Sequence, residues 1–374
     1  MKRITTRLLM TAIMLILGSG LVSLKAQNFF QGQTKLTIVG NAQIDYVSDS
    51  SQSQFRNLAF KPIFLWTLSD KLFIESEIEF ATGKEGVEIV LEYANMVYFV
   101  NQHLALHGGR FLPKFGAFRG RFGEAYLQKL ATNPVGFGDG GIGPMTETGV
   151  GFQGGAQLGL TKINYDFYLT NGPQLLTSPA GSQGQFEYEA YVGNNKGKAM
   201  GGRFGFLPFS NSSLEIGYSF MYKKKTGDIH TSYEPTAAVW QAYDLNYVKD
   251  VDAFKSIIRI LAEWKSMQVE TRDYLDTAGV PYTFDNTSTA FYVQPSIRPS
   301  QAESEFFRNL ELVARYSEFN TPNAANWGGG KYKQSAFGLN YWYRWNGVLK
   351  FTWQKQFLND SSSNSFVAQL VYGF

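Results

Sequence analysis

Cysteine is absent from the 374 residues, so the chain can form neither a disulfide framework nor a thiolate metal site. Histidine is scarce: His103, His107 and His230 are the only three. No serine lies close in sequence to His103 or His107, and two histidines four residues apart in a strand need not form a metal site. We therefore expect no enzymatic activity, no bound metal and no cofactor.

Long apolar runs are also missing after residue 27, where no stretch of 18 apolar residues occurs. This excludes helices that cross a membrane. Charged residues make up only 17 % of the chain, whereas aromatic residues make up 16 %, and 38 residues are glycine. An aromatic-rich, helix-poor chain is typical of two classes, a soluble all-β protein or a transmembrane β-barrel.

The N-terminus carries an export signal. Lys2, Arg3 and Arg7 give a positive start, residues 8–22 are almost wholly apolar, and the segment ends on the small residue Ala26. This three-part pattern predicts a signal peptide over residues 1–26, leaving 27–374 as one mature domain. The alternative is an uncleaved membrane helix, but the apolar run is short for a span and no stop-transfer pattern follows it.

The net charge of +3 belongs to this signal. Removing its four basic residues from the 34 leaves 30 basic residues against 31 acidic ones in the mature chain. The mature chain is therefore nearly neutral, and its charge gives no reason to expect a nucleic-acid partner.

Alternation of apolar and polar residues is the strongest pattern of the mature chain, and it indicates β-strands. A soluble sandwich would alternate in the same way, so the period alone does not choose between the two classes. Sixteen strands are predicted within a range of 14–18, and residues 186–192 alternate as well and would add strand length or a hairpin. The predicted strands are 35–46, 58–68, 71–81, 87–100, 103–112, 148–158, 162–170, 199–209, 214–222, 240–248, 255–268, 288–298, 308–318, 333–344, 348–357 and 365–374.

The connections between these strands alternate between long and short along the chain. This is the arrangement of an outer-membrane barrel, with long extracellular loops and short periplasmic turns. Closure into a barrel leaves no unpaired strand edge in lipid. Aromatic residues near strand ends suit a belt at the membrane interface, although ordinary β-core packing would also account for them: Trp66, Tyr341, Trp342, Tyr343, Trp345, Tyr372 and Phe374. We predict an all-β fold, a transmembrane antiparallel β-barrel.

Several segments resemble the phosphate-selective porin O and P family of Gram-negative bacteria, including the Bacteroidetes group. They are Gly109–Gly116, Asn195–Ala199, Gly202–Pro208, Phe291–Gln294 and Leu339–Trp342, and the likeness covers residues 60–374. The resemblance implies a sixteen-stranded, often trimeric, passive pore in the outer membrane. It also implies that barrel-insertion machinery uses the terminal aromatic pattern of Leu370, Tyr372 and Phe374.

The predicted polar strand faces depart from the cationic pore lining of the family's best-known members. Seven basic residues occupy these faces: Lys61, Arg203, Arg259, Lys265, Arg315, Arg344 and Lys350. Nine acidic residues oppose them: Asp45, Glu75, Glu77, Glu79, Glu88, Glu92, Asp166, Glu263 and Glu311. This balance puts phosphate selectivity in doubt.

The segment 113–147 is the strongest functional candidate, because structureless loops beyond ~12–15 residues are usually functional or disordered. The family resemblance implies that it folds into the lumen as the third outer loop. We expect a constriction at Arg110, Lys114, Arg119 and Arg121, facing an acidic wall of Glu75, Glu77, Glu79, Glu88 and Glu92. Such charge rows set selectivity in pores. The alternative is that the loop charges form salt bridges that only hold the loop.

Residues 136–141 match the dinucleotide-binding pattern G-x-G-x-x-G, but no buried strand precedes them and no helix follows. These glycines more plausibly let the loop turn tightly. The predicted function is therefore passive diffusion of small hydrophilic solutes or ions across the outer membrane. Two alternatives remain open: a specific channel for a small anion such as phosphate, and a non-conducting barrel with a structural role in an envelope complex.

Overall fold

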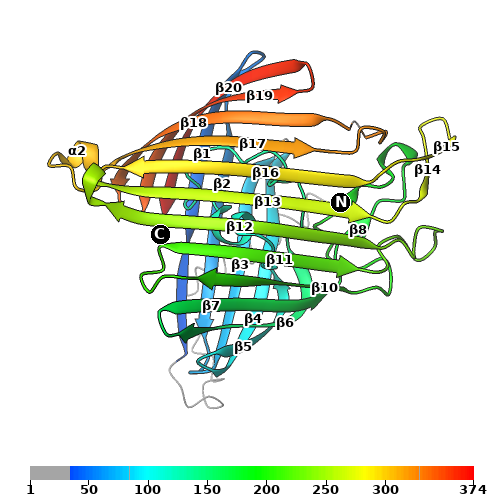
Figure 1. Cartoon of the computed structure of the whole chain (residues 1–374), viewed down its shortest axis with the longest axis horizontal. Coiled ribbons are helices and arrows are strands. Elements are labelled where there is room, and N and C mark those ends of the chain that lie inside the picture. The colour runs from blue at the N-terminus through cyan, green and yellow to red at the C-terminus, as the bar shows by residue number, and fades with distance from the viewer. Residues whose placement is uncertain (1–33, 84, 328) are drawn as a thin grey trace.

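The computed structural model describes residues 34–374 except 84 and 328, so the predicted signal peptide lies outside the described residues. Sixteen antiparallel strands close into one barrel (Figure 1). The closure is made by β1 (Lys35–Asp49), which pairs with β20 (Ser361–Gly373) over the register Asn41↔Gly373 to Asp49↔Ser365. No helix in the described part of the chain is long and apolar enough to cross a bilayer.

Each predicted strand overlaps one strand of the wall, which confirms the fold class and narrows the strand number to sixteen. Between β1 and β20 the wall contains β2 (Ser53–Thr67), β3 (Leu72–Gly83), β4 (Gly86–Asn101), β5 (Leu104–Phe111), β6 (Glu147–Leu158), β7 (Thr161–Thr170), β10 (Ala199–Leu207), β11 (Leu214–Lys223), β12 (Ala238–Val251), β13 (Ser256–Val269), β16 (Thr287–Arg298), β17 (Leu310–Asn320), β18 (Lys331–Arg344) and β19 (Gly347–Leu358).

Four short strands lie outside the wall, in the long connections. β8 (Gln174–Leu175) pairs with β9 (Phe186–Glu187), and β14 (Asp273–Leu275) pairs with β15 (Pro281–Thr283). The alternating segment 186–192 therefore contributes only to a small loop hairpin. Single helical turns complete the fold: η1 (Phe118–Phe122), η2 (Ala180–Ser182), η3 (Asp252–Phe254) and α2 (Glu305–Arg308).

The two ends of the barrel differ, as Figure 1 shows: β14 and β15 extend from the end with the long loops, and α2 lies at the end with the turns.

The first, second and eighth long connections are shorter in the structure than the sequence predicts. β1 and β2 continue to pair as far as Ser48↔Ser53, and β19 and β20 pair as far as Leu358↔Ser361. Polar residues occupy both faces there, so the alternation that marks a strand disappears while the backbone ladder continues.

The wall is apolar outside and mixed inside. Phe337, in the middle of β18, is 64 % exposed on the outer face, and Leu370 and Tyr372 also point outward. Gln369 and Lys350 are buried on the inner face. Of the predicted interfacial aromatics, Trp342 is the exception, because it is buried inside the barrel against Ala125 and Tyr126. The outer band has the apolar character that a bilayer-spanning wall needs.

Candidate functional site

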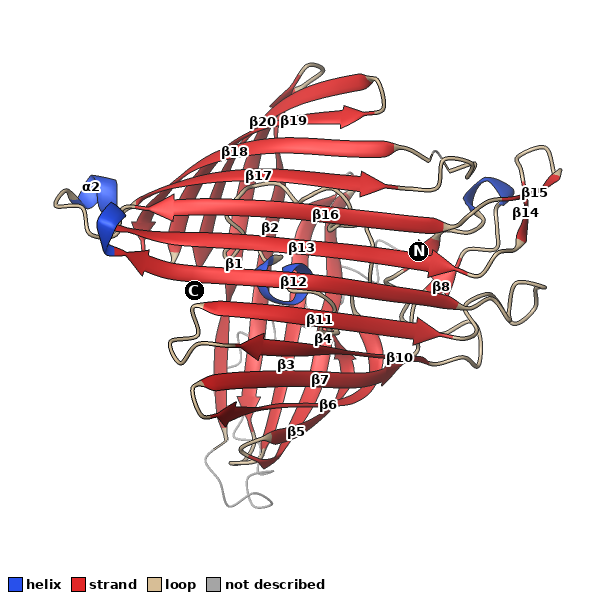
Figure 2. Ribbon diagram, in the orientation of Figure 1, coloured by secondary structure: helices blue, strands red, loops and turns tan. Residues whose placement is uncertain are grey.

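The third loop, residues 112–146, fills part of the lumen. It starts there because β5 is only eight residues long, so the chain leaves the wall before crossing it fully. The helical turn η1, seen through the wall in Figure 2, belongs to this loop. Tyr126 reaches the short-turn end of the barrel, where its hydroxyl donates a hydrogen bond to the carbonyl of Trp345 at 2.7 Å.

Aromatic packing fixes the loop against one side of the lumen. The ring of Phe118 lies 5.8 Å from Phe137 and 5.7 Å from Tyr292, both in edge-to-face geometry. Phe115 and Ile142 join the same buried cluster, which includes wall residues of β10 to β13 and β16. The loop therefore covers the inner wall on this side, and the open part of the lumen lies on the opposite side of the barrel.

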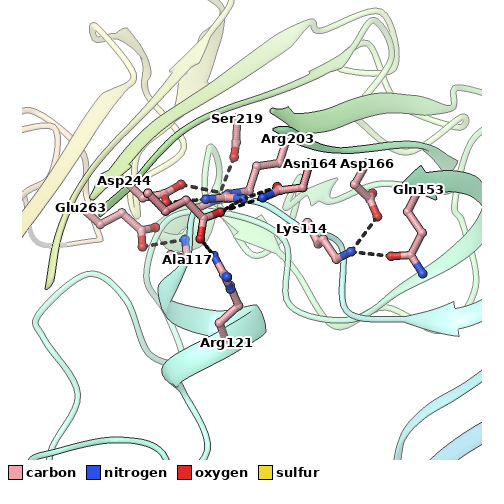
Figure 3. A network of polar contacts seen from close by, with 12 residues as sticks. Lys114, Ala117, Arg121, Gln153, Asn164, Asp166, Arg203, Ser219, Asp244 and Glu263 are labelled. Carbon is pink, nitrogen blue, oxygen red and sulfur yellow. Dashed lines mark hydrogen bonds and ion pairs between the residues drawn. The ribbon is translucent and has the colours of Figure 1, made fainter. Parts of the chain in front are cut away.

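A buried carboxylate holds the start of η1. Glu263, from β13, accepts the backbone N–H group of Ala117 at 2.9 Å (Figure 3). It also accepts the backbone N–H group of Phe118 at 2.7 Å and pairs with Lys265 at 3.2 Å. Gly116 precedes them with φ +67°, and a Cβ there would overlap the Glu263 carboxylate. Glycine is therefore required by both the left-handed backbone and the close approach.

Arg203 lies at the centre of a second network, between the wall and the third loop. Its guanidinium pairs with Asp244 at 2.6 Å and with Glu215 at 3.0 Å, and Arg121 of the loop reaches the same Glu215 at 2.7 Å (Figure 3). Arg203 is buried, so this predicted pore-lining residue is engaged in the wall and does not face open water. Burial without such partners would be costly for its charge.

The descending and returning halves of the loop are held at further points. Arg315 donates to the carbonyl oxygens of Thr132 at 2.6 Å and Asn133 at 3.0 Å. Lys129 pairs with Glu311 at 3.1 Å, and Lys350 donates to the carbonyl of Ala125. Arg315, another predicted pore-lining residue, therefore binds the loop backbone from the wall.

The predicted constriction residues divide into two groups. Lys114 pairs with Asp166 of β7 at 3.4 Å, and Arg121 pairs with Glu215 of β11, so neither opposes β3 and β4 as expected. For these two the expected opposition is wrong, and the alternative of salt bridges that hold the loop is what the structure displays. The reason is that the carboxylates on the loop's own side are buried by its packing and require charge partners.

Arg119 and Arg110 occupy different positions. Arg119 lines the open cavity, near Asp139 at 3.7 Å. Arg110 belongs to β5 rather than to the loop; its guanidinium bonds Thr146 and stacks 3.8 Å from the centre of the Tyr191 ring. Only Arg119 of the four predicted constriction residues lines this cavity.

The open cavity has a volume of about 480 Å³ and lies between the third loop and strands β1 to β4. Glu77, Glu79, Glu88 and Glu92 line it, as predicted for the polar face of this wall. A β-bulge lies between β3 and β4. Glu77 pairs with Tyr93 while the next residue, Ile78, pairs with Leu91, so Glu92 is left without a partner in the ladder. Bulges re-aim side chains in this way, and here both Glu92 and Tyr93 reach the cavity.

Three other predicted lining residues do not line this cavity. Glu75 accepts a hydrogen bond from Asn95 at 3.0 Å. Arg259 is half-buried with its guanidinium 5.9 Å from the ring of Phe122, and Arg344 is exposed at the turn between β18 and β19. Sequence reasoning missed Glu189, which enters the cavity from the connection between β7 and β10. It lies in the alternating segment 186–192, but alternation does not reveal that this connection folds toward the cavity.

The C-terminal strand closes the barrel beside the site. Backbone groups of Gly40 and Phe374 exchange two hydrogen bonds of 3.0 Å, and the Phe374 ring stacks on Phe60 at 5.3 Å. Leu370 and Tyr372 lie on the same outer face. The terminal aromatic pattern is therefore exposed at the membrane-facing surface of the short-turn end.

Comparison with known proteins identifies the fold. No protein-family model matches the chain, and no curated protein matches it. Solved structures do match: the outer membrane channel DcaP of Acinetobacter baumannii has 11 % identity and TM-score 0.57, over 91 % of this chain and 97 % of that one. The anion-selective porin from Comamonas acidovorans has 12 % identity and TM-score 0.54, over 91 % and 100 %. A trimer form of OmpT, an outer membrane protein of Vibrio cholerae, has 10 % identity and TM-score 0.54, over 91 % and 99 %. At these identities the likeness is one of fold.

Proposed function

We propose that the protein is an outer-membrane porin of a Gram-negative bacterium, through which small hydrophilic solutes and ions diffuse passively. One observation carries this proposal: a closed wall with an apolar outer face encloses a polar cavity of about 480 Å³ beside an inward-folded loop. The names of the structural neighbours, a channel and a porin among them, support the same class.

The geometry gives each part a task in diffusion. The third loop covers one side of the lumen, so a solute meets the opposite, open side, where polar side chains can replace part of its hydration. The loop is held from β7 round to β19 by Asp166, Glu215, Glu263, Glu311, Arg315 and Lys350, and it therefore defines a fixed width. Solutes move through such a pore down their concentration gradients, so it needs no energy source.

Channel recordings test the proposal. Purified protein, refolded in detergent and added to a planar lipid bilayer, should produce stepwise, ohmic conductance increments. A correctly folded barrel that gives no increments at any voltage would overturn the porin assignment in favour of a structural barrel.

The finer resemblance to phosphate-selective porins is not supported by the cavity. A phosphate path would need a row of free cations. The basic residues on the wall are instead bonded to other groups of the protein. Arg203 donates to the Asp244 carboxylate, Arg315 to the Gln334 amide and Lys350 to the Ala125 carbonyl. We propose a general diffusion pore and expect no saturation of conductance by phosphate.

Three further features belong to this proposal. The chain would be exported by the segment 1–26 and inserted by barrel-insertion machinery that binds the terminal pattern of Leu370, Tyr372 and Phe374. It would sit in outer-membrane lipid. A homotrimer is expected from the family resemblance, and the trimer form of one structural neighbour supports it. Mass measurement of the native complex in detergent distinguishes trimer from monomer.

A further inference from the structure

The charge of the open cavity is strongly one-sided. Eight carboxylates line it and only two cationic side chains, Lys61 and Arg119, accompany them. Both cations are engaged with carboxylates: Lys61 with Glu79 at 2.9 Å, and Arg119 with Asp139 at 3.7 Å. Most of the acidic side chains in the cavity are therefore left without a cationic partner among the described residues.

The cations that could have balanced this charge are held elsewhere. Lys114, Arg121 and Lys129 of the third loop pair with carboxylates on the far side of the lumen. The loop thus separates the charges of the pore: cations on the covered side are neutralised, and carboxylates on the open side are not. Fields in a narrow space with low-dielectric walls act strongly on a permeating ion.

An independent observation points to a cationic occupant. Asp45 of β1 is 2 % exposed and lines the cavity. The Asp45 carboxylate accepts a hydrogen bond from Asn57 at 2.8 Å on Oδ2 and lies beside the side chain of Gln369, but its buried Oδ1 atom has no donor of hydrogen-bond geometry. The buried Oε1 atom of the neighbouring lining residue Gln43 also has no donor. Buried acceptors without donors are costly, and a cation or its bound water relieves that cost.

The arrangement favours passage over trapping. Among the described residues, no three side chains of the ligating types converge closely enough to hold a metal ion. The carboxylates are spread instead over β1, β3, β4, the third loop and the connection between β7 and β10. Conduction requires binding that is favourable enough for entry and weak enough for exit, and several weak acidic positions in series meet this requirement.

We propose that this cavity, which we name the acidic eyelet, makes the pore selective for cations and admits hydrated alkali ions and small organic ammonium ions. The proposal rests on the proposed porin function. It is opposite in sign to what the sequence resemblance implies, since the members of that family with cationic linings pass anions.

Zero-current potentials in a salt gradient test it. The wild-type pore in a KCl gradient should show a larger permeability for K⁺ than for Cl⁻. The double variant Glu88→Gln/Glu92→Gln should lower this permeability ratio by at least about twofold, because two of the eight lining carboxylates are lost. Tetramethylammonium chloride should also give a potential of the cation sign.

The matched control is Asp273→Asn/Glu303→Gln, which removes two exposed carboxylates away from the eyelet, one near each end of the barrel. It should leave the ratio unchanged. Heat-dependent migration in SDS verifies that every variant is folded. A conducting wild-type pore with Cl⁻ preference, or a ratio that the two double variants lower equally, overturns the acidic eyelet alone. Absence of conductance in a folded barrel overturns the porin function itself.

Discussion

At the scale of single residues, the surroundings of a charge decide whether a permeating ion meets it. Arg119 illustrates this, because it is the one predicted constriction residue that lines the cavity, whereas Lys114 and Arg121 are neutralised by buried carboxylates of β7 and β11. We expect Arg119→Gln to raise the K⁺ over Cl⁻ permeability ratio. The shift should shrink as salt rises, since the screening length falls from ~10 Å at 0.1 M to ~3 Å at 1 M.

The control for this prediction is Lys196→Gln/Lys224→Gln. Both lysines are exposed in outer loops. Lys223 is unsuitable despite its place in the same basic run, because it is fully buried and donates to the carbonyls of Gly172 and Pro173 at 3.2 and 2.9 Å. If the control changes the permeability ratio as much as Arg119→Gln does, the zero-current potential depends on the charge of the outer loops and not on that of the acidic eyelet.

The outer face of the wall gives a second prediction for single residues. Phe337→Arg, in the middle of β18, should destabilise the barrel by about 2–4 kcal/mol, because it places a charge near the bilayer midplane. Leu370→Arg, near the end of β20, should cost less. Urea unfolding in lipid vesicles measures both, with Phe337→Leu as the uncharged control. Equal destabilisation by Arg and Leu at position 337 would contradict a lipid-facing position.

Gln369 is less tolerant than its inward position suggests from the sequence. Its Oε1 atom accepts a hydrogen bond from the buried Lys350 at 3.0 Å. A positive residue at position 369 would therefore meet the like charge of the fully buried Lys350. The inner face of this barrel is not uniformly wet, and its residues cannot be treated as equivalent.

At the scale of elements, the third loop is defined by its attachment to the wall. We expect Glu263→Ala to release the start of η1, because two backbone N–H groups and Lys265 lose their partner. Removing one partner of a buried ion pair typically costs about 3–5 kcal/mol. In single-channel records the variant should show frequent brief closures that the wild type lacks.

A second variant separates loop release from general loss of stability. Replacing both charges, in Glu263→Leu/Lys265→Met, removes the unpaired lysine but still leaves the N–H groups of Ala117 and Phe118 without an acceptor. Its unfolding midpoint should recover toward that of the wild type while the closures persist. Single-channel records without these closures, from either variant, would show that aromatic packing alone holds the loop.

Glu189, in the connection between β7 and β10, predicts a pH dependence of the ion selectivity. Burial raises the pKa of Glu189, the nearby Asp139 carboxylate raises it further, and Arg119 and Arg110 oppose the shift. As pH falls from 7, Glu189 should lose its charge at a higher pH than an ordinary glutamate does. Cation preference should therefore be greatest at neutral and higher pH and should begin to fall before the ordinary glutamate range is reached.

Zero-current potentials between pH 8 and 4 check this behaviour. Glu189→Gln should make the decline smaller and leave the rest, which comes from the other carboxylates of the eyelet. A pH profile unchanged by this substitution would place Glu189 outside the ion path.

At the scale of the whole molecule, closure of β1 on β20 leaves no free strand edge in the wall. Every backbone group in the lipid then depends on a neighbour, which makes local opening costly. We expect the folded barrel to resist SDS at room temperature and to migrate differently after boiling. Recovery of the protein in the soluble periplasmic fraction without detergent would contradict a membrane-spanning barrel.

The strands and their number could be predicted from the sequence, and the alternation of long and short connections favoured a barrel. Alternation in segments such as 348–357 and 365–374 depends on residues near in sequence, and the wall has one apolar face throughout, so the period of two predicts the strands and their number. It failed at 47–57 and 358–364, where both strand faces are polar. It also predicted the acidic row Glu77, Glu79, Glu88 and Glu92, because these residues lie on the polar faces of adjacent strands.

The pairing of the charges depends on the tertiary structure. Arg121 and Glu215 are 94 residues apart in the chain and Ala117 and Glu263 are 146 apart, so no spacing rule connects them. Which wall the third loop covers follows from the fit of Phe118 and Phe137 against Tyr292, a packing of loop residues against a distant strand. That choice neutralises the loop's cations on one side and leaves the carboxylates of the other side open to the pore, because a buried charge needs a partner and a hydrated one does not.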